Sequence, residues 1–328
     1  MNRLQRLHPC PTRPSSIEQV LGGSAIADAQ GAPDWPEQTL HMTGFDAPWR
    51  EAWGVAGDID AGQHGDVLWR ANQEVMFALV ELEEPSGSTA KGAGEALRAL
   101  TERAYGQLFD LMATQGTPHL WRVWNYLPDI NAEADGLERY RWFNLGRHQA
   151  YDARGTAVAQ HAPAASALGS AGGPLSIACL AGRHPPRAIE NPRQVSAYHY
   201  PDQYGPRPPV FARAVLAGDM GQPTLFVSGT ASIVGHETVH AGDVLAQCAE
   251  TARNLNAVFA EASHAGGGHH YLAHQAEHRV YVRHSNDVAA VRAFLTDALQ
   301  GAPLALVQAD VCRQDLLVEV ESVANPAR

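Results

Sequence analysis

The sequence contains one lysine, few cysteines and no long hydrophobic run. Lys91 is the single lysine among 24 basic residues, which face 35 acidic residues and leave a formal net charge of -11. This excess of negative charge is unlike proteins that track nucleic-acid phosphates or hold anionic lipids through a basic patch. No stretch approaches the roughly 18 apolar residues that cross a membrane. We therefore expect neither a nucleic acid nor a membrane as a partner, although a few placed arginines can still bind an anionic small molecule.

The cysteines are widely spaced and include no C-x-x-C pair. They are Cys10, Cys179, Cys248 and Cys312. In a chain of this size, such a pattern favours reduced thiols over a disulfide framework. Residues 1–16 carry arginines but lack the apolar stretch of a secretory signal. Together these features predict a cytoplasmic protein.

No glycine-rich loop follows a predicted strand, so a nucleotide-binding Rossmann or P-loop unit is not expected. Instead, one order of elements occurs twice. In the first half, apolar residues at spacings of three and four predict a helix around residues 97–111, followed by a strand at 119–126 and a helical stretch at 136–151. The second half repeats this order, with a helix, a strand and a helix predicted between residues 243 and 299.

This repetition predicts the fold class and the division of the chain. We expect an α+β protein, a duplicated sandwich whose mixed sheets are covered by helices on one face. Residues 153–174 are rich in alanine and low in complexity, which favours a boundary there. The N-terminal half would span residues 1–165, beginning with an irregular lead-in over residues 1–65. The C-terminal half would span residues 175–328.

Residues 236–240 spell H-E-x-x-H, the zinc-binding motif of many peptidases. That chemistry needs a continuous helix, so that His236 and His240 lie one turn apart and bind the metal together. Gly235 precedes the motif, Gly242 follows it, and two β-branched residues lie inside it, all of which weaken a helix. We therefore expect a loop at this motif, no metal site and no peptidase.

The last predicted strand, residues 316–323, alternates apolar and acidic residues. Glu319 and Glu321 share one face, about 7 Å apart, opposite Val318 and Val320. A carboxyl group held in an apolar sheet has a raised pKa and can serve as a general acid near neutral pH. A solvated strand face is the alternative interpretation.

Other segments carry arginines suited to an anionic ligand. Residues 198–209 form a stiff loop, rich in tyrosine and proline, that presents Arg207 as a carboxylate-binding fork. Residues 138–147 place arginines among aromatic residues, with Arg147 the best placed to point inward. Arg283 ends a central strand, where its charged group can reach a cleft.

In combination, four segments resemble the chorismatases: residues 124–131 (WNYLPDIN), 138–147 (ERYRWFNLGR), 198–214 (YHYPDQYGPRPPVFARA) and 226–244 (FVSGTASIVGHETVHAGDV). These enzymes split chorismate into pyruvate and either a cyclohexadiene diol or a hydroxybenzoate. The resemblance extends from about residue 65 to the C-terminus. The C-terminal half also resembles the smaller RidA-like deaminases, in Gly242, Asp243 and Gln247 and in the ending VEVESVA. The resemblance therefore implies a duplicated RidA-like, chorismate-mutase-like fold.

The resemblance also implies roles for named residues. Chorismate is a dianion with an enol ether, so it needs arginine clamps and an acid that protonates the enolpyruvyl methylene carbon. Glu319 looks like that general acid. The resemblance implies that the carboxylates are bound by Arg147, Tyr204, Arg207, Arg213 and Arg283, with Tyr140 beside them. It implies neither a metal nor a cofactor, and the oligomeric state, monomer or trimer, stays open.

Two positions bear on the product. Cys312 stands seven residues before Glu319, as in chorismatases that make hydroxybenzoate by an internal route. In that route the ring hydroxyl displaces the protonated enolpyruvyl group, and an arene-oxide-like intermediate aromatises. Ala231 stands where an enzyme specific for 3-hydroxybenzoate would carry glycine, so we expect 3-hydroxybenzoate and/or 4-hydroxybenzoate.

The sequence also allows other interpretations of Cys312 and of the function. A small core residue is the alternative role of Cys312. A chorismate hydrolase that forms the diol is the alternative within the family. A RidA-like imine deaminase or metabolite-binding protein is the alternative outside it.

Overall fold

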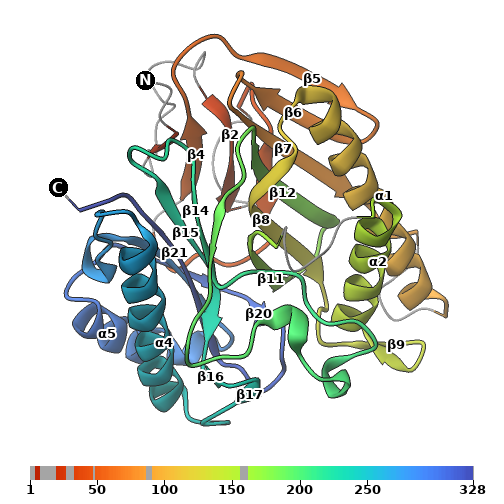
Figure 1. Cartoon of the computed structure of the whole chain (residues 1–328). Helices are drawn as coiled ribbons and strands as arrows, with labels where there is room; N and C mark the ends of the chain where they lie inside the picture. The colour runs from red at the N-terminus through yellow and green to blue at the C-terminus, as the bar shows by residue number, and fades with distance from the viewer. Residues whose placement is uncertain are drawn as a thin grey trace.

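The computed structural model describes residues 4–7, 20–26, 33–46, 49–85, 91–155 and 162–327. In this part of the chain, a seven-stranded and a six-stranded sheet lie between two helical layers. Helices α1 (Ala93–Gln115) and α2 (Arg139–Ala153) form the layer on one side. Helices α4 (Val244–Ala265) and α5 (Val288–Ala298) form the layer on the other, as Figure 1 shows.

The seven-stranded sheet has the order β20-β11-β8-β12-β7-β6-β5. Its strands are β5 (Asp60–His64), β6 (Val67–Ala71), β7 (Val75–Leu82), β8 (His119–Pro128), β11 (Ala164–Ser170), β12 (Leu175–Gly182) and β20 (Asp310–Val311). One face packs against α1 and α2 through residues such as Leu97, Leu108 and Phe143. The buried residues of α1 recur at spacings of three and four, at Leu97, Thr101, Ala104, Leu108 and Leu111, so the amphipathic pattern of the sequence produced this layer.

The six-stranded sheet has the order β13-β14-β15-β21-β18-β19. Its strands are β13 (Arg187–Ile189), β14 (Ala214–Ala217), β15 (Thr224–Ala231), β18 (Glu277–Val282), β19 (Leu304–Gln308) and β21 (Val318–Ala324). Its outer face packs on α4 and α5 through Leu255, Phe259 and Val291. Helix α4 begins after Asp243, whose side chain accepts a hydrogen bond from the backbone nitrogen of Ala246.

The two sheets repeat one topology. Leaving out β20, the order β5-β6-β7-β12-β8-β11 corresponds to β13-β14-β15-β21-β18-β19. The pairs β8/β11 and β18/β19 are parallel, whereas β12 and β21 run antiparallel to their neighbours. A single helical layer covers one face of each sheet (Figure 1). The predicted fold, a duplicated α+β sandwich with mixed sheets covered on one face, is confirmed.

The lead-in is not irregular, as we had expected for residues 1–65. Its described residues form a four-stranded sheet, with β1 (Gln5–Leu7), β2 (Val20–Ile26), β3 (Glu37–Leu40) and β4 (Arg50–Gly54) in the order β1-β4-β2-β3. The glycines that suggested loops allow close approach instead. A Cβ on Gly22 would lie 2.2 Å from the Phe77 ring, and one on Gly23 would lie 1.9 Å from the Glu51 carbonyl oxygen.

The low-complexity stretch does not separate the two sheets. Strand β11 lies almost wholly within the boundary predicted between residues 165 and 175, β12 directly follows it, and both strands pair with β8 in the first sheet. By strand pairing, the first half extends to Gly182. Small residues are needed in β11 because it is buried against the second sheet, where the Ala165 amide donates to Ser228 Oγ over 2.9 Å. Residues 156–161 lie outside the described residues.

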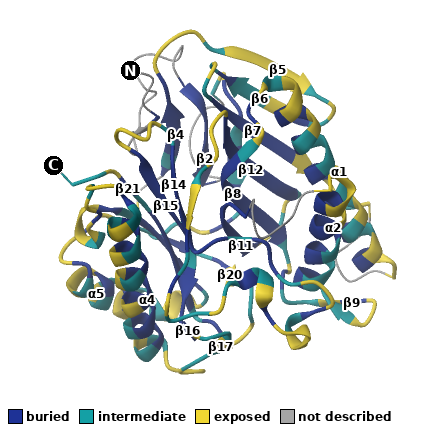
Figure 2. Ribbon diagram, in the orientation of Figure 1, coloured by how far each residue is buried: buried dark blue, intermediate teal, exposed yellow. Residues whose placement is uncertain are grey.

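The inner faces of both sheets and the lead-in sheet share one apolar core. Trp53 of β4 contacts Trp124 of β8 and Phe226 of β15, with ring centroids 5.9 and 5.6 Å apart. Figure 2 shows the central strands of both sheets buried and the edge strand β5 exposed, with the exposed residues of the helices on the side turned away from the sheets. None of the described helices is both long and apolar enough to cross a membrane.

Candidate active site

A cavity of about 640 Å³ opens where α2 approaches the C-terminal half. Its walls come from residues 131–133 and the start of α2, from the loop 200–213, from the end of β15 and the hairpin that follows it, and from the segment 312–319. Among the residues predicted from the sequence, its lining includes Tyr140, Tyr204, Arg213, Ala231, Cys312 and Glu319. The chain therefore brings together residues from both halves of the sequence, from Asn131 to Glu319.

Glu319 reaches the cavity from the central strand β21. Alternation along β21 sends Val318 and Val320 into the core beneath α4 and α5, and sends Glu319 and Glu321 to the opposite face. Glu319 is only 4% exposed and Glu321 only 5%. The predicted shared face is confirmed, and the alternative of a solvated strand face is wrong.

A bulge in β15 makes room for the Glu319 carboxyl group. The pairing of β15 with β21 shifts register between Val227 and Thr230. A Cβ on Gly229, inside this irregularity, would lie 1.9 Å from Glu319 Oε1. Bulges next to active sites commonly re-aim a side chain in this way. Only a glycine at position 229 leaves the space that the carboxyl group occupies.

The surroundings of Glu319 hold its pKa high. Burial and, to a smaller extent, the negative charge of Glu321 raise the pKa, the positive charge of Arg122 opposes the rise, and the net result is a pKa of about 8. At neutral pH the carboxyl group is therefore mostly protonated. A buried, protonated carboxylic acid at a cavity wall is the arrangement required of a general acid.

Cys312 and Tyr140 lie close to Glu319 and carry no charge at neutral pH. Burial, followed by the nearby Glu319, raises the pKa of the Cys312 thiol to about 12. Burial also raises the pKa of Tyr140, and the neighbouring Cys312 adds to the effect. Since thiolates are the reactive form of cysteine, the Cys312 thiol is not poised as a nucleophile.

The positive charge of the cavity comes mainly from Arg313 and Arg213. The Arg313 guanidinium stacks over Tyr204 at 4.0 Å and Tyr200 at 5.1 Å from the ring centroids. Its Nη1 donates to the His236 carbonyl oxygen over 2.9 Å, while its buried Nη2 has no hydrogen-bond partner among the described residues. Arg213 donates through Nη2 to the Tyr200 hydroxyl over 2.8 Å. A third arginine of the lining, Arg141, donates to Glu138 over 3.3 Å.

Several named proteins are similar in sequence to this protein over most of its length. A family model described as "Chorismatase FkbO/Hyg5-like, N-terminal" matches residues 51–181. A chorismatase of Streptomyces rapamycinicus is 39% identical over 315 residues, which cover 94% of this chain and 91% of the relative. A 3-hydroxybenzoate synthase of Streptomyces hygroscopicus is 38% identical, over 88% of this chain and 85% of its own.

The chain belongs to the chorismatase family. A crystal structure of a chorismatase matches it with a TM-score of 0.87 and 32% identity, over 99% of this chain and 98% of the other. The family predicted from the four sequence segments is confirmed.

Arg147 and Arg207, predicted as substrate-binding arginines, lie outside the lining of this chorismatase-family cavity. Arg147 is buried inside α2, where its Nη2 donates to Asn144 Oδ1 over 2.6 Å and its guanidinium lies 5.0 Å from the Phe143 ring. Arg207 is exposed and faces Asp152, with Nη2 and Oδ2 3.4 Å apart. Among the arginines of residues 138–147, Arg147 was the one expected to point inward, and it does so toward the helix-covered core and not toward the cavity.

Arg283 also lies outside the lining, and its contacts point to a different task. Its guanidinium donates to the carbonyl oxygens of Leu316, Val311 and Arg313 over 2.8, 3.0 and 2.9 Å. It also reaches Asn131 Oδ1 over 3.1 Å. These bonds fix the loop that carries Cys312 and Arg313, so Arg283 shapes the cavity wall from behind.

Sequence reasoning did not single out Arg313, Tyr200 or Arg141. Arg313 directly follows Cys312, and Tyr200 and Arg141 lie inside segments already quoted for the resemblance, so proximity in sequence was the available signal. What the sequence does not encode locally is the stacking of Arg313 across two tyrosines from another loop.

The H-E-x-x-H motif forms a hairpin between β16 (Ile233–Val234) and β17 (Glu237–Thr238). His236 and His240 therefore do not share a helical face, as the flanking glycines predicted. The His236 ring lies against Tyr204, with Nδ1 3.2 Å from the tyrosine hydroxyl. Over the described residues, no group of three or more metal-ligating side chains of histidine, cysteine, aspartate or glutamate is found.

Proposed function

We propose that this protein cleaves chorismate into pyruvate and 3-hydroxybenzoate and/or 4-hydroxybenzoate. The observation that best supports this proposal is Glu319, a buried carboxyl group with a pKa of about 8 that faces a cavity lined by arginines. The names of the relatives, chorismatase and 3-hydroxybenzoate synthase, support the same substrate class.

Binding of the two substrate carboxylates falls to the arginines of the lining. Arg313 has an unpartnered, buried Nη2 among the described residues, and Arg213 lines the same cavity from the opposite loop. A guanidinium fork suits a carboxylate, and Tyr204 adds a phenol donor. Binding roles for Arg147, Arg207 and Arg283 stay predictions of the resemblance.

Catalysis begins with proton transfer from Glu319 to the methylene carbon of the enolpyruvyl group. The double bond supplies the electron pair, and the ether oxygen stabilises the cation that forms. The neighbouring ring hydroxyl then attacks the ring carbon that bears the ether oxygen. The bond between this ring carbon and the ether oxygen breaks, and pyruvate leaves with that oxygen. The hydroxyl proton returns to the Glu319 carboxylate, so the acid is restored.

The remaining arene oxide opens in one of two directions: one of its two carbon–oxygen bonds breaks, the oxygen takes up a proton, and the ring carbon that keeps the oxygen loses one, which makes the ring aromatic. One direction gives 3-hydroxybenzoate and the other gives 4-hydroxybenzoate. The atoms of chorismate account for both products, no water is consumed, and no electrons are exchanged with another molecule. The reaction as proposed therefore calls for no redox cofactor. Formation of the diol would instead consume one water.

Cys312 and Ala231 stand beside the acid that starts the reaction. Ala231 pairs with Glu319 across the β15/β21 ladder, and Cys312 lines the same wall. We assign both residues a role in excluding water and in orienting the ring, which decides between the internal route and hydrolysis. A cytoplasmic location is part of the proposal, supported by the free thiols of Cys179, Cys248 and Cys312.

Product analysis tests the proposal. Purified protein is incubated with chorismate and a chelator, pyruvate is measured with a coupled dehydrogenase, and the ring products are separated by chromatography. Pyruvate with hydroxybenzoate in equal amounts is the expected result. Pyruvate with a dihydroxycyclohexadiene carboxylate would replace the proposal with the hydrolase. No turnover by folded protein would refute both, and an imine substrate would then test the RidA-like deaminase.

A further inference from the structure

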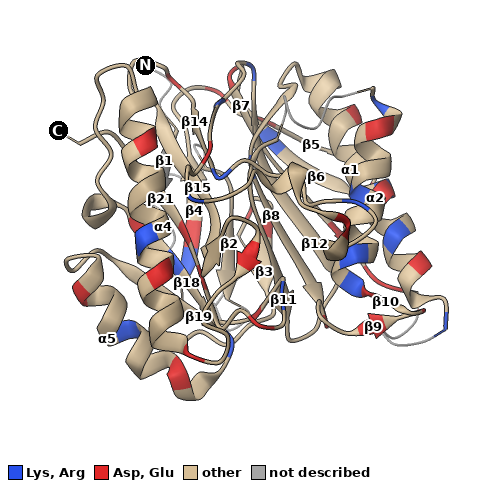
Figure 3. Cartoon of the chain, turned by 60° about the horizontal axis from the view of Figure 1, so that its bottom comes forward, with Lys and Arg blue, Asp and Glu red and all other residues tan. Residues whose placement is uncertain are grey.

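A buried cluster of charges joins the two halves behind Glu319. It consists of Arg122 on β8, Glu321 on β21, Arg279 on β18 and Glu51 on β4, none of which is more than 5% exposed. Figure 3 shows most charged residues on helices and connecting segments, so charges on the central strands are the exception. A buried charge is retained only where it is paired.

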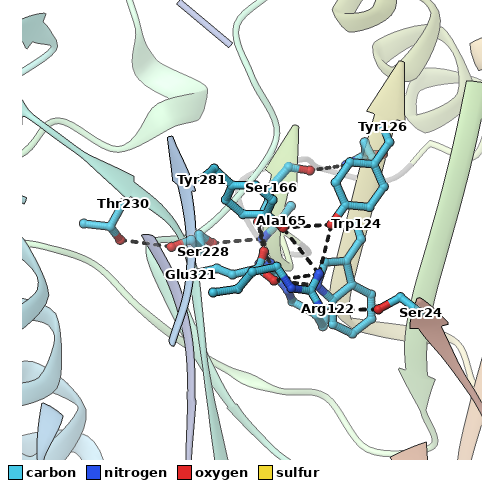
Figure 4. Close-up of polar contacts among 12 residues, drawn as sticks. Ser24, Arg122, Trp124, Tyr126, Ala165, Ser166, Ser228, Thr230, Tyr281 and Glu321 are labelled. Carbon is cyan, nitrogen blue, oxygen red and sulfur yellow. Dashed lines mark hydrogen bonds and ion pairs between the residues drawn. The ribbon is translucent and has the colours of Figure 1, made fainter. Parts of the chain in front are cut away.

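Both oxygens of Glu321 have partners (Figure 4). One oxygen forms an ion pair with Arg122 and accepts a hydrogen bond from Ser166 Oγ over 2.6 Å. The other accepts from Trp124 Nε1 over 3.2 Å and lies 3.2 Å from Arg279 Nη1. These contacts come from β8, β11 and β18, so strands of both sheets hold Glu321 in its charged form.

The cluster is neutral without Glu319. Arg279 also pairs with Glu51 over 2.7 Å, which gives two arginines and two glutamates in all. Glu319 lies two residues from Glu321 on the same strand face, about 7 Å away. Ionised Glu319 would leave one uncompensated negative charge in a buried site, where charge repulsion is screened weakly. The balance of the cluster therefore favours the neutral acid.

The other groups that face Glu319 do not supply a compensating charge. Tyr281 is its partner on β18, Tyr140 approaches from α2, and Cys312 approaches from the preceding loop. Burial raises the pKa of each of these side chains, so all are neutral at physiological pH. Arg213 and Arg313 line the same cavity, but the charges that shift the pKa of Glu319 are those of Glu321 and of Arg122 on β8.

We propose that Glu321 is a positioning residue whose negative charge keeps Glu319 protonated, and that the positive charge of Arg122, supplied by the N-terminal half, limits this effect. The proposal rests on the role of Glu319 as the general acid. Glu321 acts through Glu319 and does not touch the substrate, since it is absent from the cavity lining. The proposal makes the N-terminal half an electrostatic part of the active site.

The pH dependence of kcat/KM tests this proposal with two matched variants. In the wild type, kcat/KM falls as the pH rises through the pKa of the acid, about 8. Glu321→Gln leaves the cluster with one excess positive charge, so the alkaline limb should move to lower pH by about one unit or more. Arg122→Gln leaves one excess negative charge, so the limb should move to higher pH. Purely structural roles would lower activity in both variants without opposite shifts.

The double variant, Arg122→Gln with Glu321→Gln, restores neutrality and leaves the Arg279–Glu51 pair intact. Its limb should return close to that of the wild type, because the opposite effects of the two charges on Glu319 cancel. If either single variant fails to fold, the double variant still tests whether the alkaline limb follows the net charge of the cluster. A limb displaced in the double variant, or single variants that shift in the same direction, would overturn the proposal.

Failure of this proposal is distinguishable from failure of the proposed function. Infrared titration of the protonated carboxyl band, assigned by its loss in Glu319→Gln, follows the acid without turnover. If Glu319→Gln retains turnover, Glu319 is not the general acid. If Glu319→Gln is inactive but the carboxyl band titrates alike in wild type and Glu321→Gln, only the role of Glu321 is refuted.

Discussion

The two halves of the molecule share one strand order but carry different chemistry on the central strand. In the C-terminal half, β21 directs Glu319 and Glu321 to the inner face. In the N-terminal half, the corresponding strand β12 is buried and uncharged, and places Ala178 and Leu180 on that face. The repeat is therefore symmetrical in backbone and asymmetrical in charge.

The strand register of the two sheets places corresponding residues at equivalent positions. Leu180 pairs with Arg122 on β8, just as Glu321 pairs with Arg279 on β18. The N-terminal half has the arginine at this position but no carboxylate beside it in its own sheet. Arg122 instead pairs with Glu321 of the other sheet. The difference shows that the C-terminal half supplies Glu319, while the N-terminal half supplies Arg122, the positive charge that acts on it.

Removing the acid should give the largest effect. Glu319→Gln keeps the shape of the side chain but cannot donate the proton, so kcat should fall by about 10³-fold, within the range usual for general acids. Pyruvate release from chorismate is the measurement. Glu81→Gln on β7, a strand of the N-terminal half outside the cavity, is the control and should keep full activity. Comparable turnover in Glu319→Gln and Glu81→Gln would contradict the view that the C-terminal half alone supplies the general acid.

Filling the bulge of β15 should give the next largest effect. Gly229→Ala places a methyl group where Glu319 Oε1 lies, so the carboxyl group must shift by about 1 Å or more. A misplacement of that size costs about tenfold to a hundredfold in kcat/KM. Steady-state kinetics measures the loss.

Gly106→Ala is the matched control for Gly229→Ala. Nothing lies within 4 Å of a Cβ at position 106, which is on the helix α1 of the N-terminal half. This change should leave activity unaltered and stabilise the helix by about 0.5–1 kcal/mol. Equal activity of both glycine variants would show that the bulge does not position the acid.

Removing an arginine of the cavity should have a smaller effect, expressed mainly in binding. Arg313→Ala deletes the unpartnered Nη2 and the stack on Tyr204, so KM should rise about tenfold, as for loss of one charge-assisted hydrogen bond. Arg207→Ala, outside the lining and paired with Asp152, should leave KM unchanged. The reverse result would favour the binding role that the sequence resemblance implied for Arg207.

The arginines show where sequence reasoning ends. Periodicity correctly predicted the helices and the shared face of Glu319 and Glu321, because both follow from local geometry. It could not distinguish Arg147, which points into the core of its own half, from Arg313, which stacks on a loop more than a hundred residues earlier. That distinction depends on the path of the loop fixed by Arg283.

The lead-in and β11 show a second limit. Glycine and alanine indicate loops when they are read locally, but here they permit close packing of strands. Gly23 lies against the backbone of β4, and the alanines of β11 are buried between the two sheets. Whether a small residue ends a strand or allows its burial depends on the neighbour across the sheet, which the local sequence does not contain.

The smallest effect on rate, and the most specific on product, should come from the thiol beside the acid. Cys312→Ala leaves Glu319 and the arginines in place and removes no group that transfers the proton, so pyruvate release should change by less than about threefold. The space vacated next to Glu319 can admit a water, because polar partners are at hand. The share of diol among the ring products should therefore rise.

Cys179→Ala is the matched control in the N-terminal half. Cys179 lies on β12 with its side chain in the helix-covered core, and burial raises the pKa of its thiol to about 12, as in Cys312. Truncation there should cost about 1 kcal/mol of stability and leave the product ratio unchanged. An unchanged ratio in both variants would mean that Cys312 does not steer the product. A shift in Cys312→Ala alone would show that two thiols of similar pKa differ because only one of them lines the cavity.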